Sequence, residues 1–168
     1  MINAKRDYYQ FNRVPEFWDW LIYQGQQGNI KIPLEVYEEF KDKQDSNGQK
    51  DDLAEWSELE EVRDSLLLQE ESNPATVSHV LYTGYILEPT DTDLEKVGRD
   101  PFLISYAVGH TNPHQRCIVT AESSKPSRKG SNRHIPDVCN SFNILHYNLY
   151  QLIEALDFKT NWQATINR

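Results

Sequence analysis

Amphipathic segments alternate with short apolar runs along the chain, and the amphipathic segments predict helices. Phe17, Trp18, Leu21 and Ile22 recur at spacings of three to four residues after Pro15, which predicts a helix that begins near this proline. Similar spacing and helix-start residues predict further helices. They cover residues 33–43, residues 53–66 as one or two helices, stretches that open at 73–74 and at 100–101, a short helix after 135–138, and residues 148–157.

Three short apolar runs predict strands. Residues 117–120 are apolar and β-branched, which is typical of a strand covered on both faces. A short strand is predicted at residues 30–32, where Pro33 stops it, and a last one near residues 144–146. Short strands between amphipathic helices predict an α/β fold with high helix content and a small parallel sheet of about three to five strands.

Length and composition narrow the class of protein. The 168 residues predict a single domain over 1–168, with residues 158–168 as a C-terminal tail. No apolar run approaches the roughly 20 residues of a membrane span, and the N-terminal residues do not resemble a signal peptide. The only cysteines, Cys117 and Cys139, do not form a zinc or disulfide motif. The sequence therefore predicts a cytoplasmic protein without a membrane partner.

The net charge of −9 is unevenly distributed. Residues 1–100 carry 10 Lys and Arg against 22 Asp and Glu, whereas residues 101–168 carry 7 against 4. An acidic chain is poorly suited to coat nucleic acid through a large surface, but a local basic patch or a metal-bridged phosphate site is compatible with this distribution.

Several acids are expected near the carboxyl edge of the predicted sheet, where α/β proteins bind ligands. Glu122 follows the strand at 117–120, Asp100 begins a helix, and Glu38 and Glu39 lie on a helix after the strand at 30–32. Carboxylates that converge there would favour Mg²⁺ or Mn²⁺. Each has a simpler interpretation: Asp100 as a helix N-cap, Glu122 as loop polarity, and one of the adjacent glutamates as solvated.

One basic loop follows Glu122. Lys125, Arg128, Lys129 and Arg133 lie in it without an intervening acid. The loop is predicted either to be flexible and solvated or to hold phosphate groups beside the acidic site. Elsewhere, Asp91-Thr92-Asp93 suggests an aspartyl phosphotransferase, but no strand precedes it, and Thr90 and Asp91 are better interpreted as helix caps.

Ordered motifs along nearly the whole chain carry a resemblance to a known family. They are Tyr8-Tyr9 with Phe11, Pro15-x-Phe17-Trp18-x-Trp20-Leu21, Ile32-Pro33 with Tyr37-Glu38-Glu39-Phe40, Asp52-Leu53-Ala54-Glu55-Trp56, Asp100-Pro101-Phe102-Leu103-Ile104-x-Tyr106-Ala107, Ile118-Val119-Thr120-x-Glu122, and Ile135-Pro136-x-Val138-Cys139 with Phe142. In these motifs the chain resembles bacterial PIN-like proteins, a formerly uncharacterised family related to toxins of type II toxin–antitoxin systems.

The resemblance implies a fold, an activity and a site. The fold would be a PIN-like three-layer α/β/α sandwich, and the activity that of a Mg²⁺- or Mn²⁺-dependent endoribonuclease. The family's catalytic and metal-binding acids correspond to Glu39, Asp100 and Glu122. The implied partners are an RNA substrate, a cognate antitoxin protein and a second copy of the chain in a homodimer.

The chain departs from the family at its beginning. Such proteins open with an apolar strand that ends in a metal-binding Asp, whereas Met1-Ile2-Asn3-Ala4-Lys5 corresponds to the residues after that point. We therefore expect the natural protein to carry about ten more residues that form this strand. Two functions remain open: a metal-dependent ribonuclease toxin, and a catalytically inactive PIN-like module that binds protein or RNA. The aspartyl phosphotransferase is a distant third.

Overall fold

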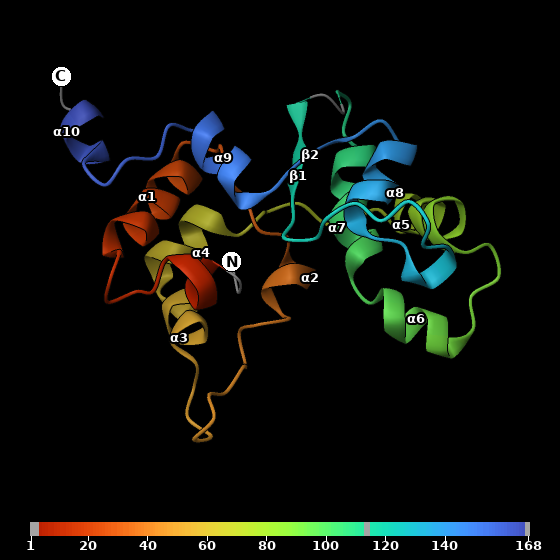
Figure 1. Cartoon of the computed structure of the whole chain (residues 1–168), viewed down its shortest axis with the longest axis horizontal. Helices are drawn as coiled ribbons and strands as arrows, with labels where there is room; N and C mark the ends of the chain where they lie inside the picture. The colour runs from red at the N-terminus through yellow and green to blue at the C-terminus, as the bar shows by residue number, and fades with distance from the viewer. Residues whose placement is uncertain (1–3, 113–114, 167–168) are drawn as a thin grey trace. The chain divides into compact units, whose positions relative to one another are not determined.

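The computed structural model describes residues 4–112 and 115–166 and is rich in helices (Figure 1). The α-helices are α1 (Pro15–Gln26), α2 (Leu34–Tyr37), α3 (Asp52–Glu58), α4 (Glu60–Leu66), α5 (Pro74–His79), α6 (Asp91–Val97), α7 (Asp100–Val108), α8 (Ile135–Ser141), α9 (Leu149–Ala155) and α10 (Trp162–Ile166). The π-helices are η1 (Ala4–Tyr8) and η2 (Val80–Tyr85), η4 (Gly130–Asn132) is a 3₁₀ turn, and the strands are β1 (Cys117–Val119) and β2 (Leu145–Tyr147). This is an α/β protein with a small parallel sheet, as the sequence predicts.

The chain forms two compact units. The first contains Met1–Glu70 together with Ile153–Arg168, and the second contains Glu71–Leu152. Each unit has its own buried core. Because two such units can fold either cooperatively or independently, a single folding domain over residues 1–168 stays a prediction.

The first unit is built on the packing of α1 along α4 (Figure 1). Helix α1 begins at Pro15, as predicted, and buries Phe17 and Trp20, each 1% exposed. Gly25 lies in its last turn, where an added Cβ would stand 2.7 Å from the carbonyl oxygen of Ser65. The absence of a side chain at Gly25 therefore allows α1 and α4 to approach each other closely.

The C-terminal segment also packs on α1. The ring of Phe158 lies 5.5 Å from that of Phe17, and the indole N–H of Trp162 donates to the carbonyl oxygen of Glu16 at 3.2 Å. The residues expected as a tail thus supply aromatic side chains to the core of the first unit.

Two predicted elements of the first unit are shorter than expected. The helix predicted over 33–43 ends at Tyr37, after which the chain continues in turns that bury Phe40. The strand predicted at 30–32 is a single parallel bridge between Ile32 and Leu67. Pro33 directly follows and has no N–H, so it cannot donate to extend this pairing.

The second unit contains the parallel pair β1–β2, in which Ile118 lies opposite His146. Within the described residues this sheet has two strands, fewer than predicted. Helices α7 and α8 pack on it, and Ile118 joins Ile104 and Val138 in the core (Figure 1). Val119 is 40% exposed, so the expected burial of this strand on both faces is wrong. Its side chain points away from Ile118, because neighbouring strand residues face opposite sides.

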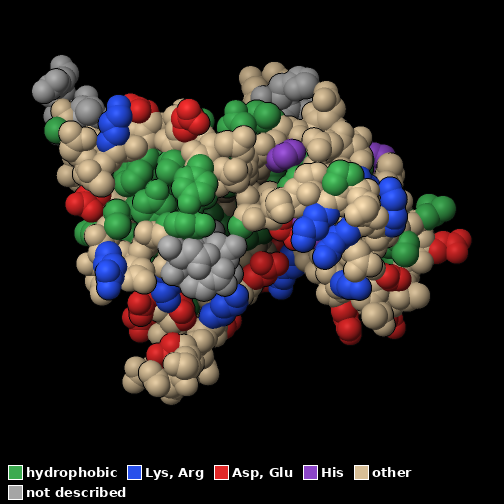
Figure 2. All heavy atoms as spheres, viewed as in Figure 1, with side chains coloured by type: hydrophobic (Ala, Val, Ile, Leu, Met, Phe, Trp, Pro, Cys, Tyr) green, Lys and Arg blue, Asp and Glu red, His purple; other side chains and the backbone are tan. Residues whose placement is uncertain are grey.

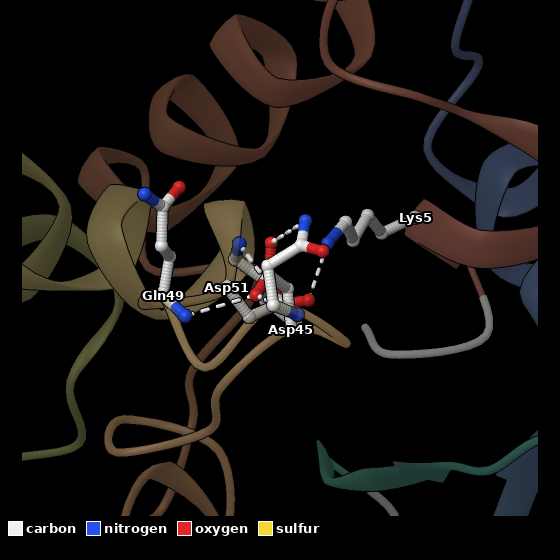
Figure 3. Close-up of polar contacts among 6 residues, drawn as sticks. Lys5, Asp45, Gln49 and Asp51 are labelled. Carbon is white, nitrogen blue, oxygen red and sulfur yellow. Dashed lines mark hydrogen bonds and ion pairs between the residues drawn. The ribbon is translucent and has the colours of Figure 1, made fainter.

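An ion pair fixes the start of α3 in the first unit (Figure 3). The Lys5 ammonium lies 2.6 Å from the Asp51 carboxylate, which also caps α3 by accepting the N–H of Leu53 at 2.9 Å. Beside it, Asp45 accepts the N–H groups of Asn47 and Gln49 and closes the preceding turn. Burial, the largest single influence, would raise the pKa of Asp51, but the contacts with Lys5 and Leu53 together hold it below the ordinary value.

Replacing Asp51 with Ala is expected to destabilise the protein in a pH-dependent way. The loss of the cap and its ion pair should lower the free energy of unfolding at pH 7 by about 1–2 kcal/mol. Because the folded-state pKa of Asp51 lies below the unfolded value, this stabilisation is complete above about pH 4 and disappears as pH falls through the folded pKa. Urea unfolding between pH 7 and pH 2.5 measures it, with Asp64→Ala on α4 as the exposed control. A difference from wild type that stays constant over this range would contradict the assignment.

Among the described residues, none of the helices has both the length and the apolar character needed to cross a membrane.

Candidate functional site

Asp100 stands at the beginning of α7 and contacts a buried tyrosine. It is the first helical residue, and Arg99 rather than Asp100 occupies the capping position. The Tyr85 hydroxyl donates to Oδ2 of Asp100 at 3.3 Å. Tyr85 is 7% exposed, whereas Asp100 is half-buried at the surface of the same core. The interpretation of Asp100 as an N-cap is therefore wrong, and its carboxylate faces a phenol from another element.

Tyr85 is placed by the end of the π-helix η2. Its neighbour Gly84 lies against α8, where an added Cβ would be 2.8 Å from Val138 and 2.9 Å from Phe142. The Arg133 guanidinium donates to the carbonyl oxygen of Gly84 and so binds the last turn of η2. A π-helical turn is rare and is often found at functional sites.

Glu122 follows β1 after a short polar turn. Its backbone N–H donates to the Thr120 hydroxyl at 3.1 Å, and its Oε2 accepts the N–H of Ile135 at 2.8 Å. Ile135 is the first residue of α8, so the carboxylate of Glu122 satisfies a free amide at the start of that helix. Glu122 is itself exposed but is held in place by these two bonds.

The two carboxylates act on the same hydroxyl. Burial raises the pKa of Tyr85 well above its ordinary value, and the negative charges of Asp100 and then Glu122 raise it further. Tyr85 therefore stays protonated and serves as a hydrogen-bond donor at any physiological pH. In the second unit Asp100 thus accepts a hydrogen bond from Tyr85, a residue that sequence reasoning missed, and the charge of Glu122 also acts on this hydroxyl.

Glu39 belongs to the first unit. It is exposed and lies in the turn that follows α2. The convergence of Glu39 with Asp100 and Glu122 stays a prediction. Over residues 4–112 and 115–166, no group of three or more His, Cys, Asp or Glu is arranged to hold a metal ion. Asp100 and Glu122 carry carboxylate oxygens, which are the ligand type that Mg²⁺ takes from proteins together with water and substrate phosphates.

The basic loop is anchored at one end and exposed along its middle. Asp137 of α8 accepts the Ser124 hydroxyl and the backbone N–H of Lys125, the latter at 2.7 Å. The side chains of Lys125, Arg128 and Lys129 are exposed, and Figure 2 shows Lys and Arg side chains gathered over this part of the second unit. The loop is therefore not wholly free, because its first residues are fastened to a helix.

Arg133 differs from the other cations of the loop. Besides Gly84, it donates to the carbonyl oxygen of Asp137 at 2.8 Å and to the Ser141 hydroxyl at 2.7 Å. Its guanidinium is thus engaged by protein acceptors on η2 and α8. These contacts hold the end of the basic loop to η2 and α8, and the role of Arg133 as a phosphate ligand stays a prediction.

Neither cysteine is suited to nucleophilic chemistry. Cys139 is fully buried, and burial raises the pKa of its thiol to about 12. Cys117 is half-buried, and burial raises its pKa to about 11. Because the thiolate is the reactive form, both side chains are inert near neutral pH.

Comparison with known proteins places the chain in a family. No curated protein and no solved structure matches it significantly. The sequence profile of a family described as a domain of unknown function, DUF4411, matches residues 1–160, which is nearly the whole chain. The protein is therefore a member of the DUF4411 family.

Proposed function

We propose that this protein is a metal-dependent endoribonuclease of the PIN-like toxin type, with Glu39, Asp100 and Glu122 as its catalytic and metal-binding acids. The observation that supports the proposal is the contact of the Asp100 carboxylate with the Tyr85 hydroxyl in the unit that also holds Glu122, whose negative charge acts on the same hydroxyl. The first comes from the start of a helix and the second from the loop after β1, the positions from which α/β proteins build ligand sites. The α/β fold with a parallel sheet is compatible with the proposed three-layer PIN-like sandwich.

The residues present fit a hard divalent cation. Carboxylate oxygens are the ligands that Mg²⁺ and Mn²⁺ prefer, and Asp100 and Glu122 would hold the ion from the second unit. When bound, such an ion polarises the scissile phosphate and lowers the pKa of an attacking water.

The other roles fall to the protein's own side chains. The Tyr85 hydroxyl restrains the carboxylate of Asp100, and the Ile135 N–H restrains that of Glu122. The exposed cations Lys125, Arg128 and Lys129 would bind the phosphates that flank the scissile bond. The proposed partners are RNA, a cognate antitoxin protein that keeps the nuclease inactive, and a second copy of the chain, all in the cytoplasm.

A catalytically inactive PIN-like module that binds RNA or protein is the second candidate. One observation favours it: Oδ2 of Asp100 and Oε2 of Glu122 already accept hydrogen bonds from the protein itself. In such a module the two acids would serve mainly to fix η2, α7 and α8. The basic loop would then bind RNA without cleavage.

The decisive experiment follows RNA cleavage with and without metal. The full chain is incubated with end-labelled single-stranded RNA in the presence of Mn²⁺, Mg²⁺ or EDTA, and Mn²⁺ binding is measured in parallel by calorimetry. We expect Mn²⁺ to bind and to support cleavage that EDTA abolishes. RNA binding without cleavage would favour the inactive module, and cleavage that persists in EDTA would contradict a metal-dependent mechanism.

Replacing Lys125, Arg128 and Lys129 together with Ala should weaken RNA binding mainly at low salt. Each phosphate contact on single-stranded RNA contributes about 0.7 to the slope of log K against log salt concentration, so the loss of three contacts should flatten the slope by about 2. Fluorescence anisotropy with labelled RNA over a range of salt concentrations measures this slope. Lys96→Ala, at an exposed position of α6 in the same unit, is the control. An unchanged slope in the triple variant would contradict phosphate binding by these three side chains and would favour a loop that is only solvated.

A further inference from the structure

Arg133, Gly84 and Tyr85 form a continuous support for Asp100. Arg133 binds the carbonyl oxygen of Gly84, and the next residue along the chain, Tyr85, donates its hydroxyl to Asp100. The support spans three elements, since Arg133 precedes α8, Gly84 and Tyr85 end η2, and Asp100 begins α7. It therefore links the basic loop to the acidic site through protein contacts alone.

We propose that Tyr85 is a positioning residue for Asp100 and that Arg133 holds the turn carrying Tyr85, so that the last cation of the loop serves the metal site rather than the RNA phosphates. This inference rests on the proposed function, since it assigns Asp100 to a metal site. It adds two residues to that site. Tyr85 was not selected from the sequence, and Arg133 was expected from the sequence to bind phosphate.

The hydroxyl of Tyr85 is not needed for packing. The ring lies in the core with Val80 and Val138, and a phenylalanine ring would fill the same space. The hydroxyl instead meets a carboxylate, and hydrogen bonds to ionised groups are stronger than those between neutral groups. A donor fixed in this way restricts the rotation of the carboxylate that it contacts.

Residues that hold a metal ligand in place by a hydrogen bond affect the affinity for the metal. Their removal typically costs about 10- to 100-fold in metal affinity, because the ligand must then be ordered when the ion binds. Gly84 supports the arrangement because any side chain there would meet Val138 and Phe142 of the second unit. The backbone thus approaches closely enough for Arg133 to reach it.

Calorimetric titration of the full chain with Mn²⁺ tests the proposal. Tyr85→Phe removes only the hydroxyl, and Tyr82→Phe removes the hydroxyl of a tyrosine that is 46% exposed on the same π-helix. We expect about 10- to 100-fold weaker Mn²⁺ binding in Tyr85→Phe and wild-type binding in Tyr82→Phe. Excess Mn²⁺ should restore RNA cleavage by Tyr85→Phe with an unchanged KM for RNA, a rescue that general damage to the fold would not show.

Arg133→Lys provides a second variant that does not depend on Tyr85. Lysine keeps the positive charge but lacks the planar guanidinium whose N–H groups donate to Gly84, Asp137 and Ser141 together. Weaker Mn²⁺ binding with an unchanged salt dependence of RNA binding supports the proposal. Wild-type Mn²⁺ affinity in both variants, or an equal loss in Tyr82→Phe, overturns it while the proposed function stands. Failure of the wild-type chain to bind Mn²⁺ overturns the proposed function and this inference together.

Discussion

Asp100→Asn is expected to reduce metal-dependent RNA cleavage by at least about 100- to 1,000-fold, the range for removing one preorganised electrostatic contact from a transition state. The substitution is nearly isosteric, and the amide oxygen of Asn can still accept the Tyr85 hydroxyl, so the packing of α7 should be retained. What disappears is the negative charge that a divalent cation needs. Mn²⁺ affinity, measured by calorimetry, should fall with the cleavage rate.

The free energy of unfolding of Asp100→Asn shows whether a loss of metal binding comes from the missing carboxylate or from a damaged fold. Because the amide oxygen of the introduced Asn still accepts the Tyr85 hydroxyl, Asp100→Asn should change the free energy of unfolding by no more than about 1 kcal/mol. Asp91→Asn is the matched control, because Asp91 is the first residue of α6 as Asp100 is of α7. Equal Mn²⁺ affinity and cleavage in Asp100→Asn and wild type would remove Asp100 from the site.

Local patterns in the sequence predicted where several elements begin but not how they associate. Pro15 marked the start of α1, and the apolar residues of β1 marked the main strand, because both depend on neighbours within a few residues. The end of α2 and the small size of the sheet were missed. They depend on how Phe40 is buried and on which strands find a partner, and neither is encoded in local periodicity.

The candidate site was also predictable only where it depends on local sequence. Asp100 and Glu122 were selected because each stands beside a predicted strand or helix start, and in the structure Asp100 accepts the Tyr85 hydroxyl while Glu122 caps the start of α8. Tyr85 itself was not selected, since an aromatic residue in an apolar stretch is usually part of a core. Its contact with Asp100 joins residues 15 positions apart, and the contact of Arg133 with Gly84 joins residues 49 positions apart. Only the packing of η2 against α7 and α8 makes these groups neighbours.

The apolar core of the first unit is expected to respond most strongly to loss of Trp20. This side chain is 1% exposed and lies between rings, with centroids 5.8 Å from Phe17 and 5.0 Å from Phe158. Truncation of a buried tryptophan to alanine typically costs about 3–5 kcal/mol, through lost transfer free energy and the cavity left behind. Trp20→Ala should therefore lower the free energy of unfolding by about this amount, while the adjacent exposed substitution Asp19→Ala should change it by less than about 0.5 kcal/mol.

The chain provides separate probes for its two units in this experiment. All tryptophans lie in the first unit, so fluorescence during urea unfolding reports on that unit alone. Cys139, 0% exposed in the second unit, becomes reactive to a thiol reagent only when that unit opens, and Cys117→Ser removes the competing thiol. If residues 1–168 fold as one domain, Trp20→Ala should shift both transitions by the same amount. A shift in fluorescence with unchanged protection of Cys139 would show that the units unfold independently, and a fluorescence shift below about 1 kcal/mol would contradict the burial of Trp20 itself.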